Sequence, residues 1–263
     1  MSNLRNDWEL DEVLRLYDKP FNELLYNAHE VHIKNHKKDM VQVCTLLSIK
    51  TGGCPEDCGY CSQSIHSKDP IESTPLMSLE EVEKQAKLAK QQGSTRFCMG
   101  AAWRRPSNKN IDRVIKMIDI VHDLGMESCV TLGMLSEDQA LRLSKSGLNY
   151  YNHNLDTSRD HYAKVISTRN YQDRLNTLKY VRKSGIKVCS GGILGLGESR
   201  SDRAELLLEL ANLDQHPESV PINMLVKMEG TRLYDNEKID ELEFIKTIVV
   251  IWKIKIILTI PIR

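Results

Sequence analysis

The chain has 263 residues, 41% of them hydrophobic, and its 36 basic and 36 acidic residues give a formal net charge of zero. This length suits one large domain or two small ones, and the charge balance removes the usual argument for a nucleic-acid or anionic-membrane partner. The amino terminus lacks the apolar segment of a secretory signal, and no apolar run reaches the ~20 residues that cross a bilayer. We therefore expect a cytoplasmic protein that acts on a small molecule and binds neither nucleic acid nor membrane.

Short β-rich runs alternate with helical stretches along most of the chain. After a helical segment at residues 8–37, the predicted strands cover residues 41–49, 96–102, 128–132, 150–156, 188–193 and 220–226. A capped or amphipathic stretch typical of a helix follows each strand, directly or after a loop, as where Ser78 and Ser136 precede apolar periodicity. Six consecutive strand–helix units indicate a parallel sheet with helices outside it, either an open doubly wound sheet or a (β/α)₈ barrel.

Three of the seven cysteines lie close together, in Cys54-Pro-Glu-Asp-Cys58-Gly-Tyr-Cys61 after the first predicted strand. The C-x₃-C-x₂-C spacing lets three thiolates hold three corners of a [4Fe–4S] cluster and leaves one iron for the amino and carboxylate groups of S-adenosylmethionine. Structural zinc is the competing interpretation, but it usually takes four ligands in C-x₂-C pairs, and the sequence has no second pair. The odd cysteine count also argues against a disulfide framework.

The loop and its neighbours resemble the radical-SAM loop of biotin synthases. The resemblance continues through residues 93–103, 150–158, 188–198 and 218–226 and covers roughly residues 10–248. It implies a radical-SAM (β/α) barrel of the TIM type with a helical N-terminal extension, which inserts sulfur into dethiobiotin in the last step of biotin biosynthesis. It also implies a flavodoxin-type electron donor, and a homodimer is one expected assembly.

Cys98, Cys129 and Cys189 occur singly, each shortly after the start of a predicted strand. A lone strand cysteine is usually a small core residue, but equal depth on three strands of one barrel lets three side chains meet in one layer. The resemblance implies that these three, with an arginine from a seventh strand, ligate a [2Fe–2S] cluster that donates sulfur. Cys44 has no partner in this pattern, so we expect it to be a core residue.

Asn152, Asn154 and Asp156 alternate along the fourth predicted strand, so all three project to one face. Strands of a parallel sheet are normally apolar, so three inward polar groups indicate a ligand site. The resemblance implies that Asn152 and Asn223 contact the ureido ring of the substrate. It likewise implies that Asn154 and Asp156 contact the ribose of the cofactor.

Four further residues are candidates for binding the cofactor. Tyr60 is placed to pack on the adenine, although an isolated tyrosine is more often ordinary packing. Gly191 and Gly192 allow a ligand to approach the backbone near the methionine moiety, although glycines also mark a flexible loop. Arg174 is a candidate for the cofactor carboxylate, although an arginine on a helix is usually solvated. His66 and His153 stay unassigned.

The sequence divides into a helical preface at residues 1–40, a barrel at 41–250 and an aberrant tail at 251–263. The resemblance stops near Val250, so we expect the last two barrel strands to be missing; Pro261 falls near the position of the cluster arginine, and Arg263 is out of register. The isoleucine-rich tail suggests a frameshift or a decayed gene. The alternative function is therefore a partly folded decay product that binds an iron–sulfur cluster without catalysis. For the chain as it stands we expect cofactor cleavage with little biotin formed.

Overall fold

The computed structural model describes residues 5–37 and 40–254. Two N-terminal helices, α1 (Leu10–Asp18) and α2 (Phe21–Asn35), precede parallel strands that alternate with helices. The strands are β1 (Cys44–Lys50), β2 (Arg96–Ala101), β3 (Glu127–Thr131), β4 (Tyr150–Asn152), β5 (Lys187–Cys189), β6 (Gly192–Leu194) and β7 (Ile222–Met224). The later helices are α3 (Leu79–Gln91), α4 (Asn108–Asp123), α5 (Glu137–Lys145), α6 (Arg159–Val165), α7 (Tyr171–Lys183), α8 (Arg200–Ala211) and α9 (Glu241–Lys253).

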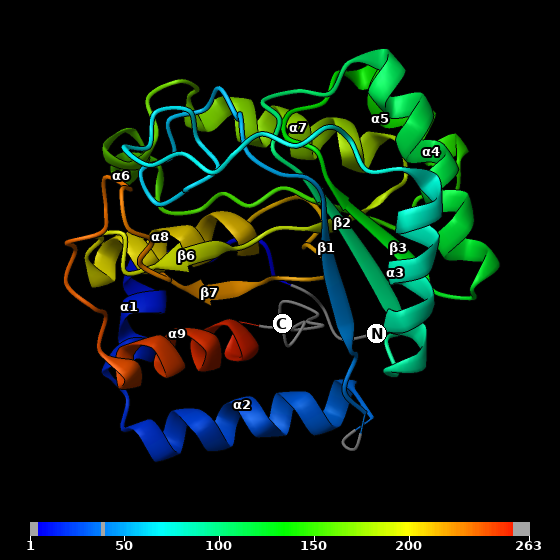
Figure 1. The fold of residues 1–263 in the computed structure, drawn as a ribbon. Coiled ribbons are helices and arrows are strands. Elements are labelled where there is room, and N and C mark those ends of the chain that lie inside the picture. Colours follow the sequence, from blue (N-terminus) through cyan, green and yellow to red (C-terminus); the bar gives the residue numbers. More distant parts are fainter. Residues whose placement is uncertain (1–4, 38–39, 255–263) are drawn as a thin grey trace.

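The strands follow one another across a curved parallel sheet with helices on its outer side (Figure 1). Strands β1 to β5 pair in sequential order, and β6 pairs with β7. Strands β5 and β6 are two halves of one predicted strand, and single bridges continue the pairing across the break, from Asp156 to Gly192 and from Cys189 to Ser219. The described residues thus form the predicted six-strand, incomplete (β/α) barrel.

Local sequence sets where the helices begin. Ser136 and Gln139 form a reciprocal capping box at the start of α5, as predicted. The Ser78 side chain accepts a hydrogen bond from the Glu81 amide at the start of α3. Each cap satisfies backbone N–H groups that have no partner within the first helical turn. These caps place the helices so that their apolar faces cover the sheet.

The fourth strand is shorter than predicted, so the predicted range of residues 150–156 is wrong. Strand β4 ends at Asn152, and Asp156 has a φ of 71°, a value outside the extended region of a strand. Backbone pairing nevertheless continues, since His153 N donates to Cys189 O at 2.9 Å. Helix α6 follows immediately and was not predicted. The polar end of β4 is therefore an irregular segment that stays paired with the neighbouring chain rather than a regular strand.

Helices α1, α2 and α9 pack together beside β7 and α8 (Figure 1). The buried Tyr17 hydroxyl of α1 bonds to Thr247 Oγ1 of α9 at 3.1 Å. Arg200 of α8 pairs with Glu243 of α9 at 2.5 Å. These contacts attach the N-terminal helices to the last described helix.

No helix in the described ranges combines the length and apolar character needed to cross a membrane.

The predicted tail boundary at residue 251 falls inside a packed element. Helix α9 continues to Lys253, and Ile251 and Ile254 are buried. The expectations for Pro261 and Arg263 lie outside the described residues.

The chain at the start of β6 packs closely against the chain before β7, and a substitution at this contact tests the strand placement. A Cβ atom at Gly191 would overlap the carbonyl oxygen of Pro221, which is backbone and cannot rotate away. We expect Gly191→Ala to lower the free energy of unfolding in urea by about 3 kcal/mol or more, the upper end of overpacking effects. The matched control Gly100→Ala, whose Cβ would meet nothing nearer than 3.7 Å, should change it by less than about 1 kcal/mol. Equal stability of the two variants would contradict this strand placement.

Candidate functional site

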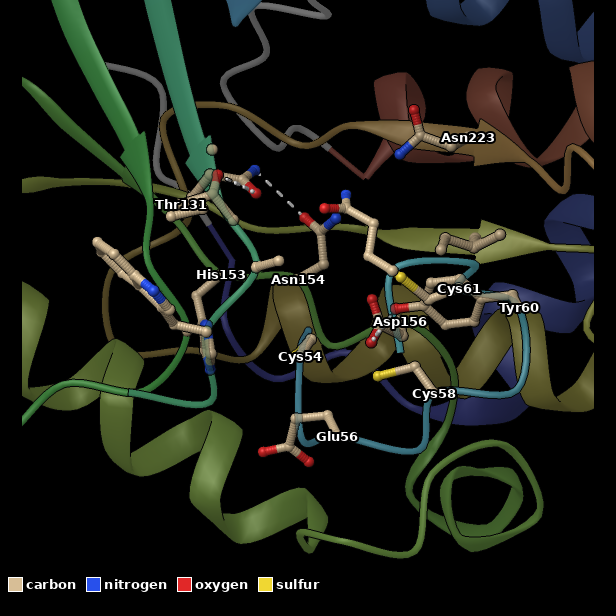
Figure 2. Close-up of a pocket in the computed structure, with 18 of the residues that line it drawn as sticks. Cys54, Glu56, Cys58, Tyr60, Cys61, Thr131, His153, Asn154, Asp156 and Asn223 are labelled. Atoms are coloured by element: carbon tan, nitrogen blue, oxygen red, sulfur yellow. Dashed lines mark hydrogen bonds between the residues drawn. The ribbon is translucent and has the colours of Figure 1, made fainter. Parts of the chain in front are cut away.

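A pocket of about 470 Å³ opens where the parallel strands end. Its wall combines the loop after β1 with the ends of β2, β3 and β4 and with β7. The volume lies within the range of about 300–1,000 Å³ typical of small-molecule sites. Figure 2 shows side chains from these elements pointing into one space. The pocket lies at the edge of the sheet where ligands bind in parallel α/β folds.

The three loop cysteines, Cys54, Cys58 and Cys61, all line this pocket. Backbone hydrogen bonds fix their positions: Cys54 N donates to Gln63 O at 3.0 Å, and Cys61 N donates to Cys58 O at 2.9 Å. In Figure 2 the Cys58 and Cys61 side chains lie on one side of the pocket, with Cys54 across from them. The loop therefore presents its thiols around one volume rather than on separate surfaces.

The arrangement of the thiols fits an iron–sulfur cluster better than a single ion. Within the described ranges, no three Cys, His, Asp or Glu side chains are placed to hold one metal ion. A [4Fe–4S] cluster attaches each thiolate to a different iron, so its ligands surround a volume instead of meeting at a point. Burial raises the pKa of Cys58 to about 12, while the Arg169 guanidinium, 3.6 Å from Cys58 Sγ, opposes that rise. Cluster binding would therefore release thiol protons.

Asp57 anchors the cysteine loop to the segment after α6. Its carboxylate accepts hydrogen bonds from the backbone N–H groups of Ser167 at 2.8 Å and Thr168 at 3.1 Å. Partial burial opposes ionisation of Asp57, but the hydrogen bonds from these two residues together lower its pKa to about 2. The anchor is therefore ionised at neutral pH.

Asp156 and Arg174 form a buried ion pair beside the loop. The Tyr60 hydroxyl donates to Asp156 Oδ2 at 3.0 Å, and Arg174 Nε donates to the Tyr162 hydroxyl at 2.9 Å. Burial alone would lower the pKa of Arg174, but the Asp156 carboxylate holds it above its ordinary value. Burial, and next the Asp156 charge, raise the pKa of Tyr60 well above its usual range, so the hydroxyl remains a donor. Arg174 is thus a pocket residue and not a solvated one.

Side-chain amides line the wall between the loop and the sheet. Thr131 Oγ1 donates to Asn152 Oδ1 at 3.2 Å, and Asn152 Nδ2 lies 3.4 Å from Asn154 Oδ1 (Figure 2). Asn152 Nδ2 also donates to the Cys189 sulfur at 3.1 Å. Asn223 on β7 reaches the same pocket from across it. The structure thus brings together the asparagines that the sequence analysis grouped.

The single cysteines lie on the inner face of the sheet. Cys98 and Cys129 pair directly in the register of β2 and β3, and Cys189 pairs with Asn152. A hydrogen bond with the Cys129 thiol raises the pKa of Cys98 well above its ordinary value, while one with the Cys44 thiol lowers it. Cys44 is buried in the core, as expected, but the expectation that it has no partner is wrong, because it packs with Cys98 and Cys129.

Gly191 and Gly192 do not line the pocket. The space next to Gly191 is taken by the Pro221 backbone, and that next to Gly192 by Leu206 and the carbonyl of Asp156. Both glycines therefore allow close strand packing, and their position does not support direct contact with a cofactor.

Among the titratable residues that line the pocket, the sequence analysis missed three: Glu56, His153 and Arg169. Glu56 is only 2% exposed, and Arg169 Nε lies 3.9 Å from its carboxylate. His153 was left unassigned because a single histidine is weak evidence, but its side chain lines the pocket (Figure 2). Burial, followed by the charges of Arg174 and Arg169, lowers the pKa of His153 well below its ordinary value, so it is neutral at neutral pH.

The chain is similar in sequence to a superfamily model and to several proteins named biotin synthase. Residues 48–210 match the model of the Radical SAM superfamily. A biotin synthase of Thioalkalivibrio sulfidiphilus is 59% identical over 94% of this chain and 73% of its own length. Biotin synthases of Parvibaculum lavamentivorans and Acinetobacter baumannii (strain ATCC 17978) are 57% and 58% identical over 94% of this chain, and over 73% and 75% of their own lengths. The chain thus spans about three quarters of these relatives.

Solved structures support the fold. Methylornithine synthase (PylB) superposes with a TM-score of 0.82 at 18% identity, over 95% of this chain and 74% of that one. The FeFe-hydrogenase maturase HydG from Carboxydothermus hydrogenoformans superposes with a TM-score of 0.84 at 19% identity, over 95% of this chain and 61% of that one. Such low identity establishes only the shared architecture, whereas the sequence relatives identify the family. With more than half of its residues identical to theirs along almost its whole length, the chain belongs to the biotin synthase family of the radical SAM superfamily.

Proposed function

We propose that this pocket is where the chain inserts sulfur into dethiobiotin to give biotin. The observation that supports this most is the continuity of one pocket. The three loop thiols line it together with Asn154 and Asp156. Asn152 connects this pocket to the inner thiol of Cys189. A substrate held there would contact the loop thiols, and Asn152 would lie between it and the Cys189 thiol.

The two groups of thiols would hold two different clusters. Cys54, Cys58 and Cys61 would bind the [4Fe–4S] cluster, and the inner cysteines of the barrel would bind the [2Fe–2S] cluster. When bound, the first cluster with S-adenosylmethionine supplies a radical that abstracts hydrogen, and the second supplies sulfur. The chain itself positions these groups and keeps water away from the reacting atoms.

Asp156 is the central residue for binding the cofactor. Its carboxylate suits the two hydroxyls of a ribose, because a carboxylate accepts several hydrogen bonds. Asn154 lies beside it on the wall, and the Tyr60 ring lines the same pocket and suits an adenine. Arg174 orients Asp156 through their ion pair, and its other N–H groups remain our candidates for the cofactor carboxylate.

Asn152 and Asn223 are the proposed substrate ligands. A side-chain amide carries a donor and an acceptor side by side, which match the N–H and C=O groups of a cyclic urea. Both residues line the pocket, from β4 and from β7. They would hold the ureido ring between the two clusters.

The alternative, a partly folded decay product, has less support. The described residues share one continuous buried core that reaches from α1 to α9, and the site residues are held by hydrogen bonds. A flavodoxin-type electron donor, a homodimer and a cytoplasmic location remain predictions.

Product analysis with two cysteine variants tests the proposal. The anaerobically reconstituted chain with reductant, S-adenosylmethionine and dethiobiotin should give 5′-deoxyadenosine and, as expected from the sequence, a small amount of biotin, both measured by mass spectrometry. Cys58→Ala should give neither product, because it removes a ligand of the loop cluster. Cys189→Ala should keep 5′-deoxyadenosine formation and lose biotin, because it affects only the sulfur source.

Three outcomes would count against this assignment. Formation of 5′-deoxyadenosine by Cys58→Ala would exclude the loop cluster, and biotin from Cys189→Ala would exclude the inner cysteines as sulfur source. If the parent chain cleaves S-adenosylmethionine but yields no biotin, the non-productive alternative gains support.

The role of Asp156 is tested by a charge-removing substitution. Asp156→Asn should weaken S-adenosylmethionine binding by about tenfold or more, equivalent to about 1.4 kcal/mol, because it removes the carboxylate and frees Arg174 from its partner. Asp173→Asn is the matched control, since that carboxylate caps α7 away from the pocket. Equilibrium dialysis of reconstituted protein gives both Kd values, and thermal melting shows whether each variant is folded. Equal Kd values would contradict the proposed contact.

A further inference from the structure

Arg169 extends from the segment between α6 and α7 into the pocket, beside the cysteine loop. Its side chain is only 7% exposed. Its Nη2 atom donates a hydrogen bond to Cys58 Sγ at 3.6 Å. Among the described residues, the Nε–H group of Arg169 has no hydrogen-bond partner. The guanidinium is therefore buried against a proposed cluster ligand and has a donor left over.

The Glu56 carboxylate pairs with the same guanidinium. Its Oε2 atom lies 3.9 Å from Arg169 Nε, and the Thr168 hydroxyl donates to this oxygen. Its other oxygen, Oε1, lies 3.5 Å from Arg104 Nε. Two arginines thus share one carboxylate. Glu56 therefore holds Arg169 in place without neutralising its charge completely.

The neighbouring Arg174 differs, because it has a carboxylate of its own in the buried ion pair with Asp156. A buried charge requires a partner of opposite sign. In the part of the chain that the structure describes, the acidic groups in ion-pair or hydrogen-bond contact with Arg169 are the shared Glu56 and the Cys58 thiol. The arrangement therefore places an arginine charge directly on the sulfur of a proposed cluster ligand.

We infer that Arg169 raises the reduction potential of the cluster on the cysteine loop. This inference rests on the proposed function, because it assumes that Cys54, Cys58 and Cys61 hold a [4Fe–4S] cluster. One electron from the reductant makes such a cluster more negative, and a cation at a ligand sulfur stabilises that state. Net charge and hydrogen bonds to the sulfurs are among the factors that set the potential. Arg169 supplies both, so it makes the cluster easier to reduce.

A redox titration of the reconstituted full chain, without S-adenosylmethionine, tests this inference. The loop cluster is identified by electron paramagnetic resonance as the reduced signal that Cys58→Ala lacks. Arg169→Gln should lower the ratio of reduced to oxidised cluster at a fixed potential by about tenfold or more, which equals a midpoint potential about 59 mV lower. Arg159→Gln is the matched control, because this arginine is half exposed and pairs with Glu209. It should leave the midpoint potential unchanged.

A second variant covers the case in which Arg169→Gln binds no cluster. Arg169→Lys keeps the positive charge but lacks the planar guanidinium that contacts Cys58 and Glu56 together. Its midpoint potential should lie below that of the parent chain, and Arg159→Lys is its matched control. Iron and sulfide analysis gives the cluster content of each protein, and circular dichroism shows whether it is folded.

The outcomes separate the inference from its basis. A midpoint potential of the Arg169 variant that equals or exceeds that of its Arg159 control would overturn the inference and leave the loop cluster assigned. Loss of the cluster in both Arg169 variants would also overturn it, because Arg169 would then be needed for cluster binding rather than for the potential. If the parent chain gives no signal that Cys58→Ala lacks, the loop cluster and the proposed function fail together with the inference.

Discussion

The buried ion pair between Asp156 and Arg174 is the interaction on which the site depends most. It joins the segment after β4 to helix α7, and through the Tyr60 hydroxyl it also holds the cysteine loop. Asp156 keeps a φ of 71° in this position, a conformation that costs a non-glycine residue free energy and persists only where its surroundings fix it. Without the pair, a charged arginine would lie buried without its partner, and the loop would lose a contact with the barrel wall.

The parallel sheet separates two kinds of thiol within one interior. Strand ends carry the loop cysteines and the polar wall of the pocket, whereas the inner cysteines lie earlier on their strands. Cys98 and Cys129 each precede a pocket residue of the same face, Gly100 and Thr131. Asn152 contacts both regions, since it reaches the pocket and the Cys189 sulfur. A substrate in this pocket would therefore lie between the radical source and the sulfur source.

Much of this organisation was predictable from sequence, because it follows from local signals. Capping serines set the starts of α3 and α5, and the cysteine spacing defined the loop. The positions of His153 and Cys44 were not predictable in this way. The position of His153 depends on the irregular backbone that follows β4, and the environment of Cys44 depends on the register between β1 and β2. Both positions depend on tertiary contacts, which cannot be predicted from the periodicity of the sequence.

The central claim is that one chain binds two different iron–sulfur clusters in one barrel. Mössbauer spectroscopy of the chain reconstituted with ⁵⁷Fe tests this directly, because [4Fe–4S] and [2Fe–2S] clusters give separate signals. The account predicts both signals in the same preparation, with iron divided between them in a ratio of about two to one. A single cluster type at full reconstitution would contradict it.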